Sequence, residues 1–380
     1  MSHIKDQFLL DPDIVFLNHG SFGATPKPVF QEYQRWQCEL ERQPVEFLGR
    51  RATDLMAESR SVLADYLGTQ RDSLVYVTNA TVGVNIVAHS LNLGPGDEVL
   101  ATDHEYGACN RTWRFLSQKW GFTYINRSIS VPLTTKEDFI EQFWRDVTPQ
   151  TRIIFISHVT SPTASNFPVG EICRRARAEG ILTLVDGAHA PGQLSLNLDE
   201  IGADFYTGNL HKWLCAPKGS GFLYARPGVQ DLLEPLVISW GWQSEMPGPS
   251  QFVDHHEWQG TRDLAAFISV PMAIQFQKEN RWDKVRENCH ILAAEIEGQI
   301  CELTGLPSLY SNGAWFAQMV SARLPLGIDV LKFKSRLYEE FRVEVPLIEW
   351  NGSKLIRVSI QGYNTRQDVE CLLGALKSLL

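Results

Sequence analysis

Apolar, β-branched runs that alternate with helical patterns between residues 50 and 225 constrain the fold of this chain more than any other feature. The runs have the length of buried strands and cover residues 74–78, 98–102, 152–157, 181–185 and 221–225. Helical spacing of apolar residues lies between them, over residues 82–91, 110–120 and 171–179. This alternation predicts an α/β fold with a mostly parallel sheet that helices cover on both faces.

The remainder of the chain predicts a second, smaller domain. Residues 228–262 are rich in Trp, Pro, Gly and Gln without a clear period, which is typical of a functional loop. A helical pattern from 264 to about 303, broken near Pro271, precedes strand-like runs over 316–324 and 354–360 and helical runs over 329–341 and 366–379. We therefore expect an N-terminal segment, residues 1–20, that joins the small domain, a large domain over 21–263, and a small α+β domain over 264–380.

Charge and cysteine content limit the partners and the compartment of the protein. Acidic residues outnumber basic ones, 44 to 35, and the net charge of -9 argues against nucleic acid or an anionic membrane, because either favours a basic surface. No apolar run approaches the roughly 18 residues of a membrane span, and the N-terminus lacks the pattern of a secretory signal. Seven dispersed cysteines without a C-x-x-C pair are typical of reduced thiols, so we expect a cytoplasmic protein.

An acidic residue ends one of the apolar runs. Asp186 follows Ile181-Leu-Thr-Leu-Val, and ligands of open α/β sheets bind beyond the carboxyl ends of the strands. A carboxylate at that point can keep a pyridine nitrogen protonated, and the protonated ring of pyridoxal 5′-phosphate (PLP) is an electron sink. The alternative is an aspartate that caps a helix or closes a turn.

A lysine between two ring-bearing residues follows about 25 residues later. Lys212 lies between His211 and Trp213, where partial desolvation would lower the pKa of its amine and favour a Schiff base. A single lysine is more often a surface residue with only its stem buried. The order of the elements favours the catalytic interpretation, because Asp186, Lys212, a glycine-rich turn and another strand follow in sequence.

A third segment, Thr78-Asn-Ala-Thr-Val-Gly, closes a predicted strand and opens a helix. Small and hydroxyl residues at a helix N-terminus present backbone N–H groups and side-chain donors to a phosphate. By itself the pattern is also that of an ordinary helix cap. Together with Asp186 and Lys212, it resembles the class V aminotransferase family of fold-type I PLP enzymes.

The resemblance to this family extends nearly end to end, and four strings carry it: Phe16-Leu-Asn-His-Gly-Ser-Phe-Gly, Ser157-His-Val-Thr-Ser-Pro-Thr, Gly208-Asn-Leu-His-Lys-Trp and Glu257-Trp-Gln-Gly-Thr-Arg-Asp. The match is nearest to the isopenicillin N epimerase-like branch. It implies a fold-type I PLP-dependent transferase fold with the cofactor in the large domain. It also implies a homodimer with shared active sites and an amino acid or a peptide as substrate.

The resemblance further implies roles for single residues. Lys212 would carry PLP as a Schiff base, Asp186 would pair with the ring nitrogen, and Tyr106 would stack on the ring, where many relatives have His. His189 and His158 would face the phenolic oxygen, although relatives often have Asn at the position of His158. The phosphate-binding positions match Ala80, Thr81, Asn209, His211 and, reaching across from the neighbouring subunit, Thr261.

Two residues match positions on the substrate side. Arg357, in Ile356-Arg-Val-Ser-Ile-Gln-Gly-Tyr, corresponds to the arginine that binds the α-carboxylate, for which a planar guanidinium is well suited. Asn18, in the first of the four strings, is the second candidate. Because Arg357 comes from the predicted small domain, substrate binding could couple to closure of the two domains.

The sequence leaves several types of reaction possible. Lys212, once displaced by the substrate amine, can remove the α-proton as a general base. Return of a proton on the opposite face gives an epimerase, and we expect Tyr106 or a water beside it to supply that proton. Loss of a β-substituent gives a C–S lyase, which needs only Lys212. Transamination and a non-catalytic binding protein are further alternatives, and we favour the epimerase because of the motif resemblance.

The cysteines and histidines argue against two other functions. A cysteine desulfurase of this family needs a cysteine shortly before the arginine strand, but residues 343–352 contain none, and Cys371 falls in a predicted helix where we expect it in the core. His255 and His256 lack further ligands at a typical spacing, so we expect no metal. Three tryptophans leave two interpretations open, a wall of the substrate site and core packing: Trp240, Trp242 and Trp258.

Overall fold

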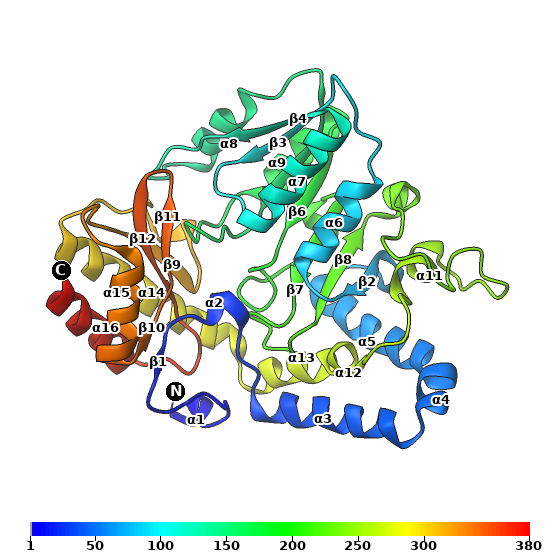
Figure 1. The fold of residues 1–380 in the computed structure, drawn as a ribbon, viewed down its shortest axis with the longest axis horizontal. Coiled ribbons are helices and arrows are strands. Elements are labelled where there is room, and N and C mark those ends of the chain that lie inside the picture. Colours follow the sequence, from blue (N-terminus) through cyan, green and yellow to red (C-terminus); the bar gives the residue numbers. More distant parts are fainter. Residues whose placement is uncertain (1) are drawn as a thin grey trace.

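A seven-stranded sheet in the order β2-β8-β7-β6-β5-β3-β4 forms the centre of the larger part of the molecule (Figure 1). The computed structural model describes residues 2–380, apart from the side chains of residues 2 and 3. Only β8 runs against the other strands, because it pairs antiparallel with both neighbours. The strands are β2 (Leu74–Val77), β3 (Glu98–Thr102), β4 (Thr123–Arg127), β5 (Thr151–Ser157), β6 (Leu182–Asp186), β7 (Phe205–Asn209) and β8 (Gly221–Ala225). The predicted α/β fold with a mostly parallel sheet is therefore confirmed.

Two strands of this sheet, β4 and β7, are missing from the sequence prediction. β4 lies at the edge of the sheet and is polar, and none of its residues is fully buried. β7 contains a glycine and an asparagine, which are depleted in strands, yet all of its residues are buried between β6 and β8. Burial in the sheet outweighs the weak local propensity of β7.

Helices cover both faces of the sheet. One face packs against α6 (Ala80–Ser90), α7 (Gly107–Trp120) and Phe252 of α11 (Gln251–Glu257). The opposite face packs against α3 (Lys27–Arg42), α5 (Ala52–Leu67), α8 (Lys136–Trp144), α9 (Val169–Ala178), α12 (Ala265–Ile268) and α13 (Val270–Glu279). Successive strand residues alternate between the two cores: Ile153 and Phe155 belong to the first, and Ile154 and Ile156 to the second.

A three-stranded antiparallel sheet in the order β11-β12-β9 forms the second part, at the left of Figure 1. Its strands are β9 (Met319–Leu324), β11 (Leu347–Trp350) and β12 (Ser353–Ser359), accompanied by α14 (Trp282–Thr304), α15 (Val330–Phe341) and α16 (Arg366–Leu379). From the N-terminal segment, β1 (Val15–Phe16) pairs in parallel with β10 (Val343–Glu344). The division at residue 264 stays a prediction, since α12 and α13 follow it but pack on α3 and α5.

The segments that connect these elements contain more structure than their sequence indicates. Residues 228–262 include most of η3 (Pro227–Leu232) and all of α11. The long pattern after 264 is divided at Ser269 and again before Trp282, and Pro271 lies in the first turn of α13. The remaining short helices are α1 (Ser2–Lys5), α2 (His19–Phe22), α4 (Pro44–Glu46), η1 (Phe47–Arg51), η2 (Arg71–Ser73), α10 (Leu198–Ile201) and η4 (Gly313–Trp315).

The sequence also predicted the absence of a membrane span and the burial of Cys371. Within residues 2–380, no helix combines the length and the apolar character that crossing a membrane requires, and the cytoplasmic location stays a prediction. The expectation that Cys371 lies in the core is wrong, because its side chain is exposed on α16. Val369, Leu372 and Leu376 form the apolar side of α16 instead. Cys371 falls between them in the sequence, but its side chain points away from that side.

Candidate active site

The candidate site lies beyond the carboxyl ends of β6 and β7, where Lys212 meets His189. The Nζ atom of Lys212 is 3.1 Å from Nε2 of His189, and the indole N–H of Trp213 donates to Nδ1 of the same ring at 3.2 Å. Because an indole can only donate, Nδ1 must accept, and a neutral His189 carries its proton on Nε2. That proton points at Lys212, whose amine can accept it only when uncharged.

The surroundings of Lys212 favour the same uncharged amine. Burial, and to a lesser extent the positive charge of Arg357, lower the pKa of Lys212 to about 7. Burial also holds the pKa of His189 well below its usual value, so the ring is neutral. A substantial share of Lys212 is therefore free amine at neutral pH, which is the form that attacks a carbonyl or accepts a proton.

Asp186 ends β6 on the face of the sheet that α6 and α7 cover. One carboxylate oxygen accepts from the backbone N–H of Ala188 at 2.9 Å, whereas the other has, among the described residues, only the thiol of Cys109 at 3.5 Å. The side chain is buried, and burial raises its pKa. A buried carboxylate oxygen without a strong donor suits a protonated ring nitrogen, so Asp186 fits the PLP pyridine.

The predicted phosphate-binding residues meet at the N-terminus of α6. The amide of Asn79 caps this helix by accepting from Val82 N–H at 3.0 Å, and Asn209 accepts from Ala80 N–H at 2.8 Å. Neither the hydroxyl of Thr81 nor the amide nitrogen of Asn209 forms a hydrogen bond with the described residues, although the carbonyl of Thr81 accepts from Asn85 at 2.8 Å. These donors, and not Ala80 N–H, are available to a phosphate.

Gly23 packs against the backbone of His211 and Lys212. His211 donates from Nδ1 to the carbonyl of Ser220 at 3.0 Å, and its Nε2 has no hydrogen-bond partner among the described residues. Gly23 has φ of 70°, and a Cβ atom there would lie 1.9 Å from the carbonyl oxygen of His211. Only glycine allows the N-terminal segment to approach Lys212 so closely.

Arg357 lies in β12 and reaches the same site from the smaller sheet. One terminal nitrogen donates to the carbonyl and hydroxyl of Ser161 at 2.8 and 3.0 Å, and the other donates to Ser21 Oγ at 3.2 Å. Its Nε is buried without a hydrogen-bond partner among the described residues, and burial lowers the pKa of the guanidinium to about 10. A buried cation with an unused donor suits a substrate carboxylate.

Asn18 supports Arg357 through a neighbour. Its side-chain oxygen accepts from Ser21 Oγ at 2.5 Å, and its amide nitrogen donates to Glu344 at 2.9 Å. Both ends of the amide are therefore engaged within the protein. Asn18 orients Ser21, and Ser21 in turn contacts Arg357.

A cleft of about 650 Å³ extends from Arg357 along the N-terminus of α7. Tyr106 immediately precedes this helix, and 46% of the residue is exposed. Tyr106 lines the cleft together with Glu105, Ser161 and Trp350. The predicted stacking residue and the predicted carboxylate-binding residue therefore face one cleft.

Two predicted cofactor residues lie outside this group. The side chain of His158 is on the opposite face of the sheet from Asp186, where Nδ1 is 2.9 Å from the hydroxyl of Tyr206, and only its backbone N–H contacts Asp186, through the carbonyl. This follows from strand alternation, because His158 continues the series of Ile154 and Ile156. Thr261 is exposed and has no hydrogen bond to Lys212 among the described residues, so its predicted role at the phosphate of a neighbouring subunit stays a prediction.

The sequence alone did not predict several residues of the site. Ser21 and Ser161 hold Arg357, and His19 lies within hydrogen-bond distance of the carbonyl of Lys212, at 3.0 Å. Glu105 is buried between Thr102 and Ser157, whose hydroxyls lie 2.5 Å from its two oxygens, and burial raises its pKa to about 8. The strings 16–23 and 157–163 mark Ser21, His19 and Ser161 as part of a motif but do not indicate their partners.

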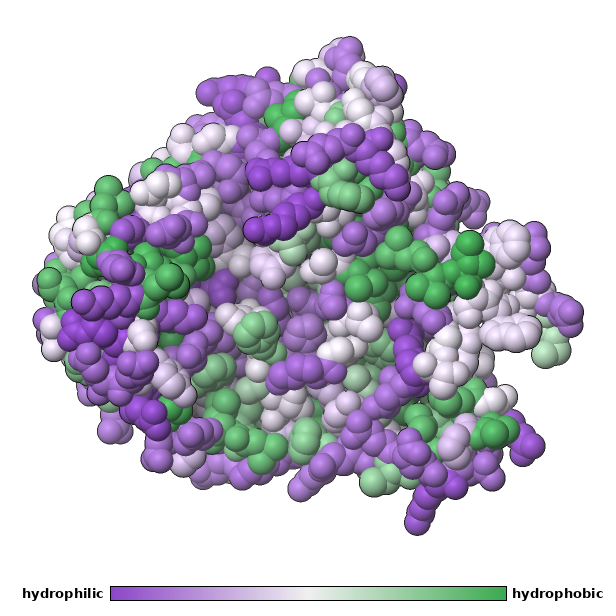
Figure 2. Space-filling model, viewed as in Figure 1, coloured by the Kyte–Doolittle hydropathy of each residue, from purple (hydrophilic) through white to green (hydrophobic). Residues whose placement is uncertain are grey.

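The tryptophans and paired histidines of the long loop lie away from this cleft. Trp240 is 85% exposed and Trp242 is 48% exposed, so neither belongs to the core, and they line other hollows of the surface. Figure 2 shows hydrophobic side chains gathered on the same side of the molecule as α11 in Figure 1. His256 is buried in α11, and neither of its ring nitrogens has a partner among the described residues.

Residues 23–372 match the family model described as aminotransferase class-V. The chain belongs to the class V aminotransferase family. The resemblance seen in the sequence is thereby confirmed, and as a member of this family the chain is a PLP-dependent enzyme. The residues described above fit that cofactor: Lys212 and Asp186 would lie at its reactive ring, and Thr81 and Asn209 would hold its phosphate.

Curated relatives within the class V family have two kinds of activity. The chain is 35% identical to an isopenicillin N epimerase of Amycolatopsis lactamdurans, with 100% of this chain and 98% of the relative covered. It is 30% identical to a protein called probable L-cysteine desulfhydrase, chloroplastic, of Arabidopsis thaliana, with 100% and 86% covered. A hercynylcysteine sulfoxide lyase of Schizosaccharomyces pombe is 24% identical, with 98% and 96% covered.

Solved structures confirm the fold-type I architecture. A cysteine desulfurase of Thermococcus onnurineus superposes with a TM-score of 0.84 at 22% identity, covering 99% of this chain and 97% of the other. A mutant of the cystine C–S lyase C-DES superposes with a TM-score of 0.86 at 22% identity, covering 99% of both chains. At this identity the likeness concerns the class V fold alone.

Proposed function

We propose that this chain is an amino-acid epimerase of the class V family, in which Lys212 removes the α-proton and Tyr106 returns a proton from the other side. The observation that carries the proposal is the buried Lys212 amine, which lies 3.1 Å from Nε2 of His189 and whose pKa is lowered to about 7. A free amine in a buried site is a competent base at neutral pH. The full-length similarity to isopenicillin N epimerases supports the choice of outcome.

The residues of the chain divide the work of this reaction. Arg357 binds the α-carboxylate with its Nε and with the second N–H of the nitrogen that contacts Ser21, which fixes the α-carbon over the site. PLP, when bound, supplies the electron sink for the charge left on that carbon. Lys212 takes the proton on its Nζ, and Tyr106 carries a phenolic proton into the cleft that Arg357 also lines.

A C–S lyase that eliminates a β-substituent from a cysteine derivative is the second candidate. The full-length similarity to cysteine desulfhydrases and to a hercynylcysteine sulfoxide lyase favours it. It requires Lys212 and Arg357 but not the acid on the opposite side. The two candidates therefore differ in their need for Tyr106.

Incubation of the holoenzyme with a panel of L-amino acids in D₂O tests the proposal. An epimerase yields deuterated substrate of both configurations, whereas a lyase yields pyruvate and a thiol. We expect Tyr106→Phe to keep the aromatic ring and cofactor binding but to lose the D-product, and Lys212→Ala to lose exchange altogether. Full racemisation by Tyr106→Phe, or pyruvate as the main product of the unmodified enzyme, contradicts the epimerase.

We also propose that the enzyme works as a homodimer with shared active sites. The support comes from exposed apolar side chains in the segment that precedes Thr261, all of them at least 41% exposed: Leu232, Leu236, Val237, Ile238, Trp240, Trp242 and Met246. Such a group on one surface favours burial against a partner. Sedimentation velocity of the holoenzyme tests this, and a monomer at micromolar concentration contradicts it.

A further inference from the structure

The hairpin of β11 and β12 forms one wall of the cleft and has a tight tip. Trp350 pairs with Ser353, and the two residues between them, Asn351 and Gly352, have φ of 45° and 74°. Two successive residues with positive φ are typical of the turn that joins short antiparallel strands. The tip is therefore well defined, and Trp350 stands at its edge.

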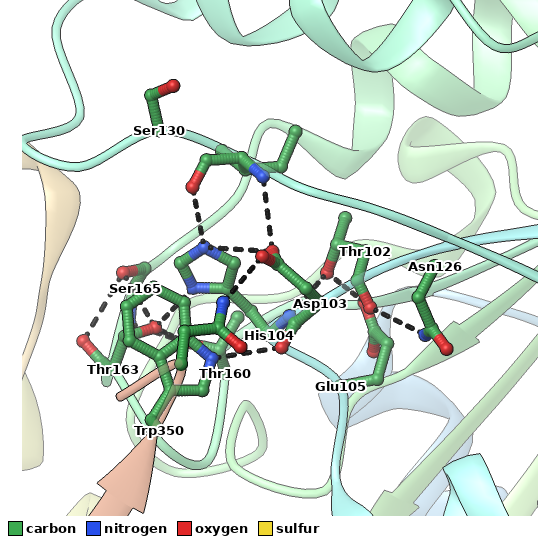
Figure 3. A network of polar contacts seen from close by, with 12 residues as sticks. Thr102, Asp103, His104, Glu105, Asn126, Ser130, Thr160, Thr163, Ser165 and Trp350 are labelled. Carbon is green, nitrogen blue, oxygen red and sulfur yellow. Dashed lines mark hydrogen bonds and ion pairs between the residues drawn. The ribbon is translucent and has the colours of Figure 1, made fainter. Parts of the chain in front are cut away.

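Two side chains of this tip bind one residue of the large sheet. The indole N–H of Trp350 donates to the carbonyl of Asp103 at 2.9 Å, and the amide of Asn351 donates to the carboxylate of Asp103 at 2.6 Å. Figure 3 shows Trp350 lying against His104, and the two ring centres are 4.5 Å apart. We call Asp103, Trp350 and Asn351 the tip clasp.

The large-sheet side of the tip clasp is itself held in place. The other oxygen of the Asp103 carboxylate accepts from Ile129 N–H at 3.1 Å. His104 is fully buried, donates from Nε2 to the carbonyl of Ile129 and accepts from the hydroxyl of Thr163 at 2.6 Å. Burial lowers the pKa of His104 to about 4, so the ring is neutral near pH 7. On the large-sheet side, the clasp therefore adjoins a hydrogen-bonded network whose His104 and Thr163 are buried.

The clasp connects the two groups that face the substrate. Tyr106 follows Asp103 by three residues, on one wall of the cleft. Arg357 lies on the other wall of the cleft, four residues after Ser353 along β12. At the rise of a strand, this separates the two residues by about 13 Å. Arg357 is bonded to Ser161 near the base of the hairpin, so the clasp is a second attachment near its tip.

We propose that Trp350 is a positioning residue for binding of the substrate α-carboxylate. By bonding to Asp103, it holds the hairpin against the large sheet and keeps Arg357 in place relative to Tyr106 and Lys212. The proposal rests on the proposed function in that Arg357 binds the carboxylate. It assigns to Trp350 no contact with the reacting atoms, so its effect passes through Arg357.

The test compares Trp350→Phe with the matched control Trp315→Phe in the holoenzyme. The indole of Trp315 also donates to a backbone carbonyl, that of Thr134 at 3.1 Å. Trp315 lines a different cavity, however. The probes are L-methionine and its decarboxylated amine, 3-(methylthio)propylamine, titrated by the change in the cofactor absorbance. We expect Trp350→Phe to weaken methionine binding roughly three- to tenfold, the usual effect of one lost hydrogen bond, and to leave the amine unchanged.

Asn351→Gly gives a second, independent break of the clasp. It removes the hydrogen bond from the side-chain amide of Asn351 to Asp103. Glycine also suits the positive φ of that position, so the turn itself is preserved. We expect the same selective loss of methionine binding. Combined with Arg357→Lys, Trp350→Phe should add little further loss, because both act on one contact.

Three outcomes overturn the inference. The first is an equal effect of Trp350→Phe and Trp315→Phe, and the second is an equal effect on methionine and on the amine. In both cases Arg357 can still bind the carboxylate, so the proposed function stands. The third is a wild-type enzyme that binds methionine and the amine equally well, which overturns the role of Arg357 as well.

Discussion

Replacement of Trp213 by Phe tests how the protein keeps Lys212 uncharged. Trp213 is fully buried, and its N–H fixes the tautomer of His189 by donating to Nδ1 at 3.2 Å. Without that donor, the proton of His189 can move to Nδ1, and Nε2 then accepts from the ammonium form of Lys212. A hydrogen bond to a charged group is worth about 1.5–3 kcal/mol, and each pH unit of pKa corresponds to about 1.4 kcal/mol. We therefore expect the pKa of Lys212 to rise by about one to two pH units.

The assay follows the loading of the apoenzyme with PLP as a function of pH. The uncharged amine is the reactive form, so the rate rises with pH through the pKa of Lys212, which is about 7 in the unmodified chain. In Trp213→Phe the rise should move to higher pH, and loading at pH 7 should slow about five- to fiftyfold.

Trp113→Phe is the matched control for this measurement. Trp113 is also fully buried, but its indole nitrogen has no hydrogen-bond partner among the described residues. It therefore reports the loss of side-chain volume without the loss of a hydrogen bond. If the pH profile of Trp213→Phe coincides with that of Trp113→Phe, the tautomer of His189 does not control Lys212, and the reasoning is refuted.

Three further predictions concern the charged residues of the site. Glu105→Gln should flatten the pH dependence of stability, because the folded pKa of about 8 exceeds the ordinary 4.5, so the native protein loses about 1.4 kcal/mol per pH unit as pH rises through that window. Urea unfolding at pH 5 and pH 8 checks this, and an unchanged difference between the two proteins contradicts it. Arg357→Lys should raise the KM for amino acids about ten- to hundredfold, through loss of the charged bonds of the planar fork, and equal KM values speak against that role. Asp186→Asn should weaken PLP retention at least about tenfold on dialysis, because the buried carboxylate loses its charge, and full retention contradicts the assignment.

The order of motifs along the chain was enough to predict the fold class and the cofactor. Buried strands read as apolar runs because both of their faces are covered, and Asp186 ends such a strand. β7 escaped prediction because its glycine and asparagine are weak strand formers, although the sheet buries them. The motif indicated His158 as a cofactor residue but did not indicate the direction of its side chain. Strand alternation turns that side chain to the opposite face of the sheet from Asp186.

The supports of the site could not be predicted because they come from distant parts of the chain. Ser21 and Ser161 reach Arg357 across 336 and 196 residues, and Trp350 reaches Asp103 across 247. No local pattern encodes such pairs, because the topology of the two sheets brings them together.

What the sequence by itself determined is therefore the chemistry that is available: a lysine, a carboxylate and an arginine in the order of a PLP enzyme of class V. What only the tertiary structure decided is the state in which these groups stand ready. The charge of Lys212 depends on desolvation and on the tautomer of His189, which the indole of Trp213 selects. Protonation is a property of the folded surroundings, since burial and neighbouring donors set its free energy.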